Sequence, residues 1–398
     1  MTNKKTVCDI DISGKTVLVR VDYNVPFKPN TTDISDDSRI KMSLPTIRYL
    51  VQERCKIILC SHLGRPRGKF DKTLQMLPIS QRLSEILEVP IIQAQDCIGP
   101  SVSEAVYNMA PGEIMLLENL RFHSGEEEND SKFSASLVGN MTDIFVNDAF
   151  GAAHRAHASI EGVTHFLPSV AGLLMTQELE MLGTILDNPQ KPFLAIIGGS
   201  KVSDKIGILH NLTKKVDTLI IGGGMAATFL KASGLEIGNS SIEKDQVFEA
   251  EKLLRNAQNT GLNILLPEDV VMADTFSSEA KDKIFPVSKI PSKAVIMDIG
   301  PETILSFEKS IHKAKTVLWN GPMGVFEWNQ FALGTSSIAR AIAGLTKSMT
   351  VIGGGSTAEA VRKFGFANQM THVSTGGGAS MEFLEGEKLP GVFALMDK

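Results

Sequence analysis

Four glycine clusters in the second half of the chain could bind phosphate. They follow short apolar runs and precede stretches that favour helix: Gly198-Gly-Ser-Lys201, Gly222-Gly-Gly224, Gly353-Gly-Gly355 and Gly376-Gly-Gly378. A glycine turn between a strand and a helix exposes backbone N–H groups, and the helix dipole adds partial positive charge. One cluster could be only a tight turn, but four in one half, the first followed by Lys205, predict a polyphosphate site. The P-loop pattern GxxxxGK(S/T) is absent, which excludes an ordinary Walker-type NTPase.

Three further features of this half bear on nucleotide binding. Lys201 and Lys205 would share one face of a helix beginning near Ser200, where they could hold two points of a phosphate chain. Glu327 could accept a hydrogen bond from a ribose hydroxyl, and a capping or surface role is the alternative. The cluster at Gly222 also satisfies GxGxx(G/A), a weak match that leaves open a dinucleotide oxidoreductase with Glu243 as its ribose-binding acid.

The first half of the chain is rich in arginine instead. Nine of the twelve arginines precede residue 160, and five cationic side chains lie in strand-end or loop contexts: Arg39, His62, Arg65, Arg121 and Arg155. A guanidinium presents a fixed fork suited to carboxylate and phosphate, whereas lysine acts as a mobile point charge. With Asp22 and Asn24 nearby in the pattern, these cations predict a site for a small anion that also offers a hydroxyl.

The sequence predicts no metal site. The four cysteines, Cys8, Cys55, Cys60 and Cys97, include no CxxC pair, which suits a reducing compartment better than a disulfide framework. The stretch Ala153-His-Arg-Ala-His157 has no acidic partner at metal-ligand spacing.

Short apolar runs separated by helix-like stretches must position these residues. They are rich in Val, Ile and Leu, and they lie at 17–21, 57–60, 114–117, 144–146, 194–197, 218–221, 264–266, 295–297, 317–319 and 351–352. Such runs indicate buried parallel strands with helices on both faces, an α/β fold that binds ligands at the carboxyl ends of its strands. A helix predicted over 173–186 is stopped by the prolines of 187–192, and we place a domain boundary there.

Length and charge limit the possible functions. At 398 residues and 43.1 kDa the chain is long enough for two domains. Its net charge of −5 predicts no electrostatic attraction to nucleic acid or to anionic lipid. The polar N-terminus lacks a signal sequence, and no apolar stretch approaches the length of about 18 residues that a membrane helix needs. We therefore expect a soluble, cytoplasmic protein that binds neither nucleic acid nor membrane.

These residues lie in longer motifs that closely resemble phosphoglycerate kinases along essentially the whole chain. The motifs are Val19-Arg-Val-Asp-Tyr-Asn-Val-Pro26, Ser61-His-Leu-Gly-Arg-Pro66, Glu118-Asn-Leu-Arg-Phe122, Asn147-Asp-Ala-Phe-Gly-Ala-Ala-His-Arg-Ala-His-Ala-Ser159, Gly198-Gly-Ser-Lys-Val-Ser-Asp-Lys205, Trp319-Asn-Gly-Pro-Met-Gly-Val-Phe-Glu327 and Ser374-Thr-Gly-Gly-Gly-Ala-Ser380. Chance agreement at all of these, in order, is negligible.

The resemblance implies two Rossmann-like three-layer domains with parallel sheets, joined by a hinge helix, in a monomer. Residues 1–186 would bind 3-phosphoglycerate, with the tail of about 390–398 packing back on them, and 187–389 would bind the nucleotide. The implied reaction is reversible phosphoryl transfer between 1,3-bisphosphoglycerate and Mg-ADP, giving 3-phosphoglycerate and ATP in glycolysis. Closure of the domains would bring the substrates together.

The family pattern also implies a role for individual residues. Those implied for the glycerate substrate are Asp22, Tyr23, Asn24, Arg39, His62, Leu63, Gly64, Arg65, Arg121 and Arg155. Those implied for the nucleotide are Lys201, Lys205, Gly222, Gly223, Ile296, Glu327, Gly354, Gly355, Ser356 and Thr357. Those implied to flank the transferred phosphoryl group are Arg39, Lys201, Lys205 and the backbone of Gly376, Gly377 and Gly378.

Two positions depart from the family pattern. Ser356 stands where the pattern usually has Asp, so it brings a hydroxyl but no negative charge toward Mg²⁺. We expect a weaker apparent site for Mg²⁺ and a reduced turnover. A catalytically weakened or silent nucleotide-binding homologue is the alternative function. Ile296 stands where the pattern often has Gly, which leaves only backbone contact with the nucleotide at that point.

Overall fold

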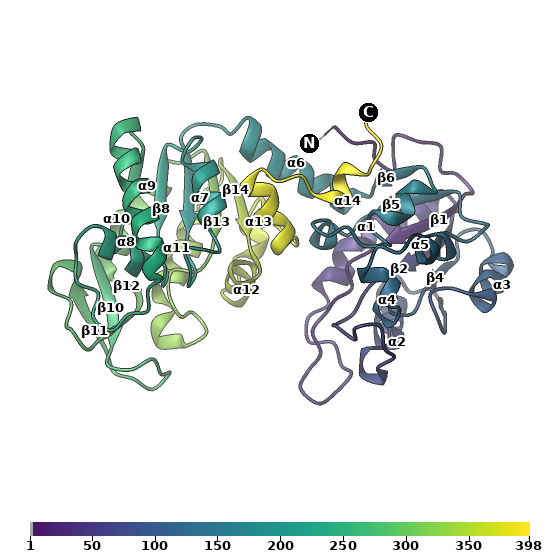
Figure 1. Ribbon diagram of the computed structural model, residues 1–398, viewed down its shortest axis with the longest axis horizontal. Helices are drawn as coiled ribbons and strands as arrows, with labels where there is room; N and C mark the ends of the chain where they lie inside the picture. The colour runs from purple at the N-terminus through teal and green to yellow at the C-terminus, as the bar shows by residue number, and fades with distance from the viewer. Residues whose placement is uncertain (1–2) are drawn as a thin grey trace. The chain divides into compact units, whose positions relative to one another are not determined.

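The apolar runs form two six-stranded parallel sheets in a computed structural model that describes residues 3–398 (Figure 1). The α/β fold class with two parallel sheets is confirmed. The chain divides into two compact units, Met1–Glu180 with Lys388–Lys398, and Met181–Glu387. The division lies within the predicted helix, which is α6 (Leu173–Asp187).

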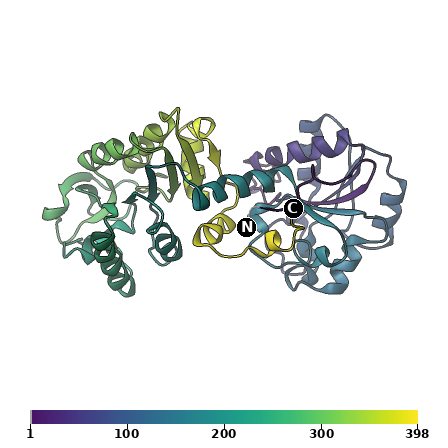
Figure 2. The ribbon, with the colours of Figure 1, turned by 90° about the horizontal axis from the view of Figure 1, so that it is seen from above.

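The first unit has a sheet in the order β3-β4-β2-β1-β5-β6. Alternate residues of its strands enter two separate cores: Val17 and Val19 lie in one, and Leu18 lies in the other. Because both faces are apolar, helices must cover both, as Figure 2 shows. The elements are β1 (Thr16–Arg20), α1 (Ser38–Gln52), β2 (Lys56–Cys60), α2 (Leu77–Leu87), β3 (Ile91–Gln93), α3 (Pro100–Asn108), β4 (Ile114–Leu116), α4 (Ser124–Glu127), α5 (Ser131–Val138), β5 (Ile144–Asn147) and β6 (Ser169–Ala171), with short 3-10 turns η1 (Lys72–Leu74), η2 (Leu120–Phe122), η3 (Phe150–Ala152) and η4 (Gly162–His165).

The C-terminal tail packs on the first unit. Its short helix α14 (Pro390–Phe393) lies beside this unit, and the Asn147 side chain donates to the Gly391 carbonyl (3.0 Å). Lys4 forms an ion pair with Asp397 (2.7 Å), so the two ends of the described chain are neighbours.

The second unit has a sheet in the order β15-β14-β13-β7-β8-β9. Its elements are β7 (Phe193–Ile197), α7 (Ile206–Leu212), β8 (Thr218–Ile221), α8 (Ala226–Ala232), η5 (Lys244–Gln246), α9 (Val247–Thr260), β9 (Asn263–Leu265), α10 (Pro301–Ile311), β13 (Thr316–Asn320), η7 (Asn329–Phe331), α11 (Leu333–Ala343), β14 (Met349–Gly353), α12 (Gly355–Lys363), η8 (Ala367–Gln369), β15 (His372–Val373) and α13 (Gly378–Glu385).

One apolar run was assigned to the wrong sheet. The run at 295–297 is part of β12 (Val295–Ile299), which pairs antiparallel with β10 (Asp269–Ala273) in a small sheet completed by β11 (Asp282–Pro286) and followed by η6 (Val287–Lys289). Its inward side chains pack on their own small core with Phe331, so an apolar run of this length does not distinguish the two sheets. Within residues 3–398, no helix is long and apolar enough to cross a membrane.

Candidate functional site

Hydrogen bonds between the loops at the carboxyl ends of β1, β2 and β4 hold several of the predicted glycerate-binding residues near one another. Asn24, after β1, accepts a hydrogen bond from the Gly64 N–H (3.0 Å) through Oδ1. Asn119, after β4, accepts from the Leu63 N–H (3.1 Å) and donates to the Leu63 carbonyl (2.8 Å). The loop after β2 is therefore held from both sides, which fixes the backbone that carries His62.

Tyr23 has a structural role in this edge. Its side chain is fully buried, its hydroxyl is hydrogen-bonded to Ser43 (2.8 Å), and its N–H donates to Ser61 Oγ (2.9 Å). Burial raises the pKa of the phenol, so it stays neutral. Tyr23 therefore stabilises the loop after β2, and its side chain is not accessible to solvent.

Arg39 and Asp22 form an ion pair at the start of α1. A cation in the first turn of a helix is unfavourable because the helix dipole is positive there. Asp22 supplies the compensating charge: burial opposes its ionisation, but the charges of Arg39 and Arg20 hold its pKa below the usual range. The pair leaves Arg39 about one-third exposed (34%), so its guanidinium can still contact an anion.

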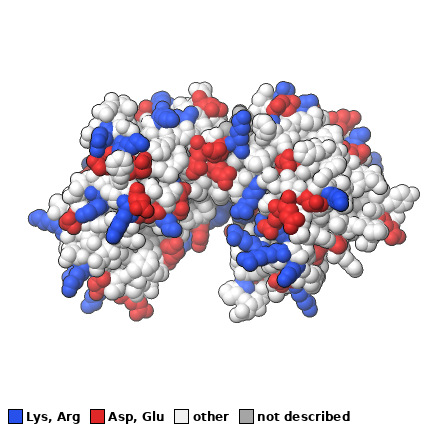
Figure 3. Space-filling view, viewed as in Figure 1, with Lys and Arg blue, Asp and Glu red and all other residues white. Residues whose placement is uncertain are grey.

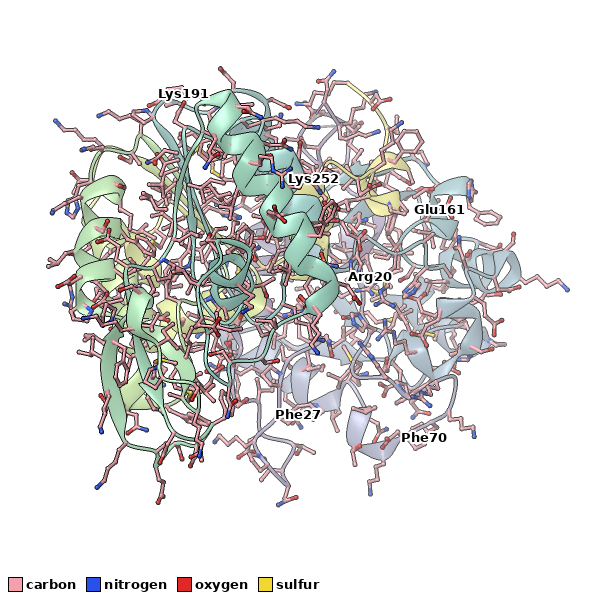
Figure 4. All side chains as sticks on the ribbon, turned by 60° about the vertical axis from the view of Figure 1, so that its left-hand side comes forward. Arg20, Phe27, Phe70, Glu161, Lys191 and Lys252 are labelled. Atoms are coloured by element: carbon pink, nitrogen blue, oxygen red, sulfur yellow. The ribbon has the colours of Figure 1, made fainter. Side chains whose placement is uncertain are left out.

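His62 is held by Arg20, a residue absent from the sequence-based site. Arg20, labelled in Figure 4, is buried and only 1% exposed. Its Nη2 donates to His62 Nδ1 (3.0 Å), and its Nε donates to Ser159 Oγ (2.8 Å). Because a guanidinium only donates, His62 Nδ1 must accept and the ring proton lies on Nε2. Burial, then the charge of Arg20, lowers the pKa of His62 well below its usual value, so the ring offers a neutral N–H donor.

Arg121 joins the same edge, whereas Arg65 and Arg155 are exposed. Arg121 is buried (8% exposed) and donates to the Gly64 carbonyl (2.8 Å). Its Nε also forms an ion pair with Glu127 (3.3 Å). Burial lowers the pKa of Arg121, Glu127 offsets this in part, and the neighbouring charges of Arg20 and Arg155 add to the lowering. The Arg155 side chain donates to Nε2 of the neighbouring His154 (3.2 Å), and no hydrogen bond or ion pair of Arg65 is found in the described chain. Figure 3 shows Lys and Arg side chains gathered on the first unit, next to a group of acidic ones.

The first two glycines in each of the first two clusters of the second unit already use their N–H groups within the protein. The Gly198 and Gly199 N–H groups donate to carbonyls of 320 and 322 (2.9 and 3.0 Å), and those of Gly222 and Gly223 donate to carbonyls of 197 and 323 (2.9 and 3.0 Å). A Cβ on Gly223 would lie 2.5 Å from the Gly199 nitrogen. Glycine is needed here because three backbone loops touch, and this interpretation replaces the predicted N–H cradle at these two clusters.

The last two clusters do begin helices. Gly354 (φ +83°) precedes α12, and Gly377 (φ +50°) precedes α13. The first N–H groups of an α-helix have no partner within the helix and can bind an anion. At α12 the exposed Gly355 and Ser356 lie in this first turn, but the Thr357 hydroxyl is buried and accepts from the Gly321 N–H (2.7 Å). At α13 the Gly376 N–H already donates to Ser374 Oγ (3.1 Å), which leaves those of Gly377 and Gly378.

The two lysines do not share a helical face, because α7 begins only at Ile206. Lys201 is exposed, while Lys205 is half-buried and donates to Asn320 Oδ1. Burial lowers the pKa of Lys205. Asn320, at the end of β13, is fully buried, and its Nδ2 has no partner in the described chain. A buried donor without a protein partner beside a lysine can be satisfied by water or by a polar ligand group.

Two predicted nucleotide-binding residues lie apart from this group. Glu327 is exposed, and only its backbone carbonyl is engaged, by Lys363 (3.2 Å). Ile296 packs against α8, and its N–H donates to Ser240 Oγ (3.0 Å), so the expected backbone contact would have to use its carbonyl. Glu243 accepts from the Ser203 N–H (3.0 Å) and hydroxyl, which occupies the acid that the dinucleotide alternative requires.

Sequence reasoning missed Arg20 and Asn320, although both carry a signal. Arg20 is the only charged residue in the apolar run 17–21, and a charge inside a buried strand is rare unless it is paired. Asn320 directly follows the run 317–319, at the strand end where ligands bind.

Two carboxylates, Asp204 and Glu385, act electrostatically on Lys205. Asp204 is exposed, and Ser356 presents a neutral hydroxyl at α12. This donor set fits Mg²⁺ bound mainly through nucleotide phosphates and water, because Mg²⁺ dehydrates reluctantly.

The comparisons with known proteins agree with one another. The phosphoglycerate kinase family model matches residues 7–387. The chain is 54% identical to the phosphoglycerate kinase of Pelotomaculum thermopropionicum and 50% identical to that of Moorella thermoacetica, in each case over 99% of this chain and 100% of the relative. Among solved structures, it is similar to the phosphoglycerate kinases of Coxiella burnetii (TM-score 0.87, 40% identity) and Pyrococcus horikoshii (TM-score 0.83, 31% identity), with 98% of both chains covered.

Proposed function

Because the chain belongs to the phosphoglycerate kinase family and transfers a phosphoryl group reversibly between 1,3-bisphosphoglycerate and ADP, we propose that its two units divide the two substrates between them. The first unit takes the glycerate and its 3-phosphate, and the second takes the nucleotide as its magnesium complex. Nothing in the comparisons supports the alternative of a catalytically weakened homologue. A cytoplasmic location and a monomeric state belong to this proposal.

The observation that carries the proposal is the crowding of buried positive charge in the first unit. Arg121 is 8% exposed, and its pKa is lowered by burial and by Arg20 and Arg155, although the ion pair with Glu127 offsets part of this. An anion bound there would relieve the burial and the repulsion that Glu127 leaves uncompensated. The neutral His62 adds an N–H donor. Asp22 and Asn24 supply oxygens for the substrate hydroxyl. Arg65 and Arg155, both exposed, complete the site from its solvent side.

The nucleotide site rests on Lys205, Asn320 and the helix starts of the second unit. Lys205 and the partnerless Asn320 Nδ2 would contact the phosphates, together with the N–H groups of Gly355 and Ser356. Gly354, Gly222 and Gly223 shape the loops, and Glu327 and Ile296 would border the nucleoside. Bound magnesium would neutralise phosphate charge and orient the terminal phosphoryl group.

The reaction needs no general base, because the nucleophile is an ionised carboxylate or a phosphate oxygen of ADP. Catalysis then consists of positioning and charge neutralisation. Arg39, Lys201 and Lys205 would neutralise the phosphoryl group in flight, assisted by the Gly377 and Gly378 N–H groups. Transfer requires the two ligands to meet, so we propose that ligand binding changes the arrangement of the units.

The test is ADP release from ATP, Mg²⁺ and 3-phosphoglycerate, with hydroxylamine trapping the acyl phosphate. Arg121→Gln should raise the KM for 3-phosphoglycerate and leave the KM for ATP unchanged, whereas Lys205→Met should do the reverse. Arg48→Gln is the matched control, because Arg48 is an exposed arginine of α1 that is not among the predicted substrate-binding residues. It should change neither the KM for 3-phosphoglycerate nor the KM for ATP. The division of substrates is refuted if Arg121→Gln acts on the KM for ATP.

A further inference from the structure

Three potential metal ligands lie together in the first unit, and the phosphoryl-transfer site uses none of them. Asp96 and Cys97 follow β3, and His123 follows η2. One carboxylate oxygen, the Cys97 sulfur and one imidazole nitrogen all lie within 4.8 Å of one another. In the described part of the chain, this is the one group of three or more such side chains that meets this condition.

We propose that Asp96, Cys97 and His123 bind a zinc ion, with water in the fourth position. Thiolate, imidazole and carboxylate are the donors that Zn²⁺ takes, usually in tetrahedral geometry, and three protein ligands leave one position open. The thiolate disfavours Mg²⁺ and Ca²⁺, which prefer oxygen ligands. The site is thereby chemically distinct from the magnesium that accompanies the nucleotide.

The ligands are already held near one another. Asp96 Oδ1 accepts hydrogen bonds from the Cys97 N–H (2.7 Å) and is 2.7 Å from His123 Nε2. The His123 ring is stacked on Phe133, with centroids 5.4 Å apart and an interplanar angle of 30°. Because a zinc ion would replace the hydrogen bond between His123 and Asp96, Nε2 would present its lone pair and the ring proton would move to Nδ1. Only small side-chain shifts are needed.

Acidic side chains surround the thiol. Asp96 and Glu126 lie close enough to Cys97 to act on it electrostatically, and their negative charges would attract a divalent ion. Binding converts the Cys97 thiol and aqueous Zn²⁺ into a zinc thiolate and one released proton.

A structural role alone explains the pair of Asp96 and His123 as an ion pair and Cys97 as a member of the apolar core around Phe133. That reading predicts no metal binding at all. A metal titration therefore separates the two readings.

The test uses the full-length protein, treated with a chelator and titrated with Co²⁺ as a spectroscopic substitute for Zn²⁺. We expect one equivalent to produce a thiolate-to-cobalt charge-transfer band that Zn²⁺ abolishes and that excess Mg-ATP does not. Cys97→Ser should abolish the band, and His123→Gln should weaken cobalt binding more than about tenfold. Cys8→Ser, which alters the exposed cysteine of the same unit, is the control and should leave the band unchanged.

A second measurement needs no variant. Zn²⁺ that binds only the folded state should raise the midpoint of urea unfolding of the first unit, which its tyrosines report. The absence of a charge-transfer band in the unaltered protein, its persistence in Cys97→Ser, or an unchanged unfolding midpoint with Zn²⁺ would each overturn the proposal.

Discussion

Asp148 is a buried carboxylate at the start of α6, and its substitution by Asn should make the first unit's stability less dependent on pH. The residue is fully buried, and its Oδ1 accepts hydrogen bonds from the Leu174 and Met175 N–H groups (2.9 and 3.1 Å). Burial raises the pKa of Asp148 from 3.8 to about 6, although a hydrogen bond from the Thr46 side chain and these two N–H groups lower it in part. Asp148→Asn keeps the Oδ1 acceptor and removes the charge.

The size and sign of the effect follow from linkage between protonation and folding. Between the unfolded value of 3.8 and the folded value of about 6, the folded state holds a proton that the unfolded state has lost. The free energy of unfolding therefore falls as pH rises through this window, by about 3 kcal/mol in total. About half of this loss lies between about pH 5 and about pH 8. Asp148→Asn has no such proton, so its stability relative to the unaltered protein should rise by about 1.5 kcal/mol over that range.

The assay is urea unfolding at the two pH values, followed by tyrosine and tryptophan signals separately. All three tyrosines lie in the first unit and both tryptophans in the second: Tyr23, Tyr49 and Tyr107, and Trp319 and Trp328. The tryptophan transition is the internal control and should have the same pH dependence in both proteins. A stability difference between Asp148→Asn and the unaltered protein that does not change with pH would refute the reasoning, whatever its constant value.

Four other substitutions test the proposed sites. Arg20→Met should raise the KM for 3-phosphoglycerate about tenfold in the coupled assay and make it pH-dependent, because His62 loses the donor that keeps it neutral; an unchanged pH profile would contradict this role. Lys205→Met should weaken ATP binding about tenfold or more by calorimetry, because a charged donor is lost. Gly223→Ala, at φ +64° and with its Cβ 2.5 Å from a backbone nitrogen, should lower the tryptophan-reported stability by more than about 2 kcal/mol. Ser356→Asp should lower the Mg²⁺ concentration needed for half-maximal activity, and an unchanged value would show that position 356 does not contact the metal.

The class of fold could be predicted because strands of a buried parallel sheet have continuous apolar sequences that are easily recognised. Nine of the ten apolar runs lie in the two parallel sheets, where helices on both faces demand apolar residues at every position. The prediction for residues 295–297 was wrong because β12, although antiparallel, also packs its core side against Phe331 and its neighbours and is therefore equally apolar. Pairing direction depends on partners distant in sequence, and an isolated apolar run does not encode it.

The glycine clusters show why residue type alone gives an incomplete site. Gly222 and Gly223 fit a phosphate-binding turn as well as Gly354 and Gly377 do, yet their N–H groups are used by neighbouring loops. The difference lies in what passes within 3 Å of each glycine, which is a tertiary property. The arginine prediction stays a prediction: Arg39 and Arg121 contact strand-end loops of the first unit, whereas Arg65 and Arg155 are exposed.

In the proposed division, the two units would bind anions by different means that suit their proposed ligands. In the first unit, Asp22 holds the guanidinium of Arg39 and the Gly64 carbonyl holds that of the buried Arg121, so their directions are set before a ligand arrives. Fixed forks can discriminate a carboxylate, a hydroxyl and a phosphate at defined spacings. In the second unit, helix N-termini and the half-buried Lys205 stabilise negative charge with less directional demand. Such a site can hold a nucleotide before and after it loses its terminal phosphoryl group, which a kinase that runs in both directions requires.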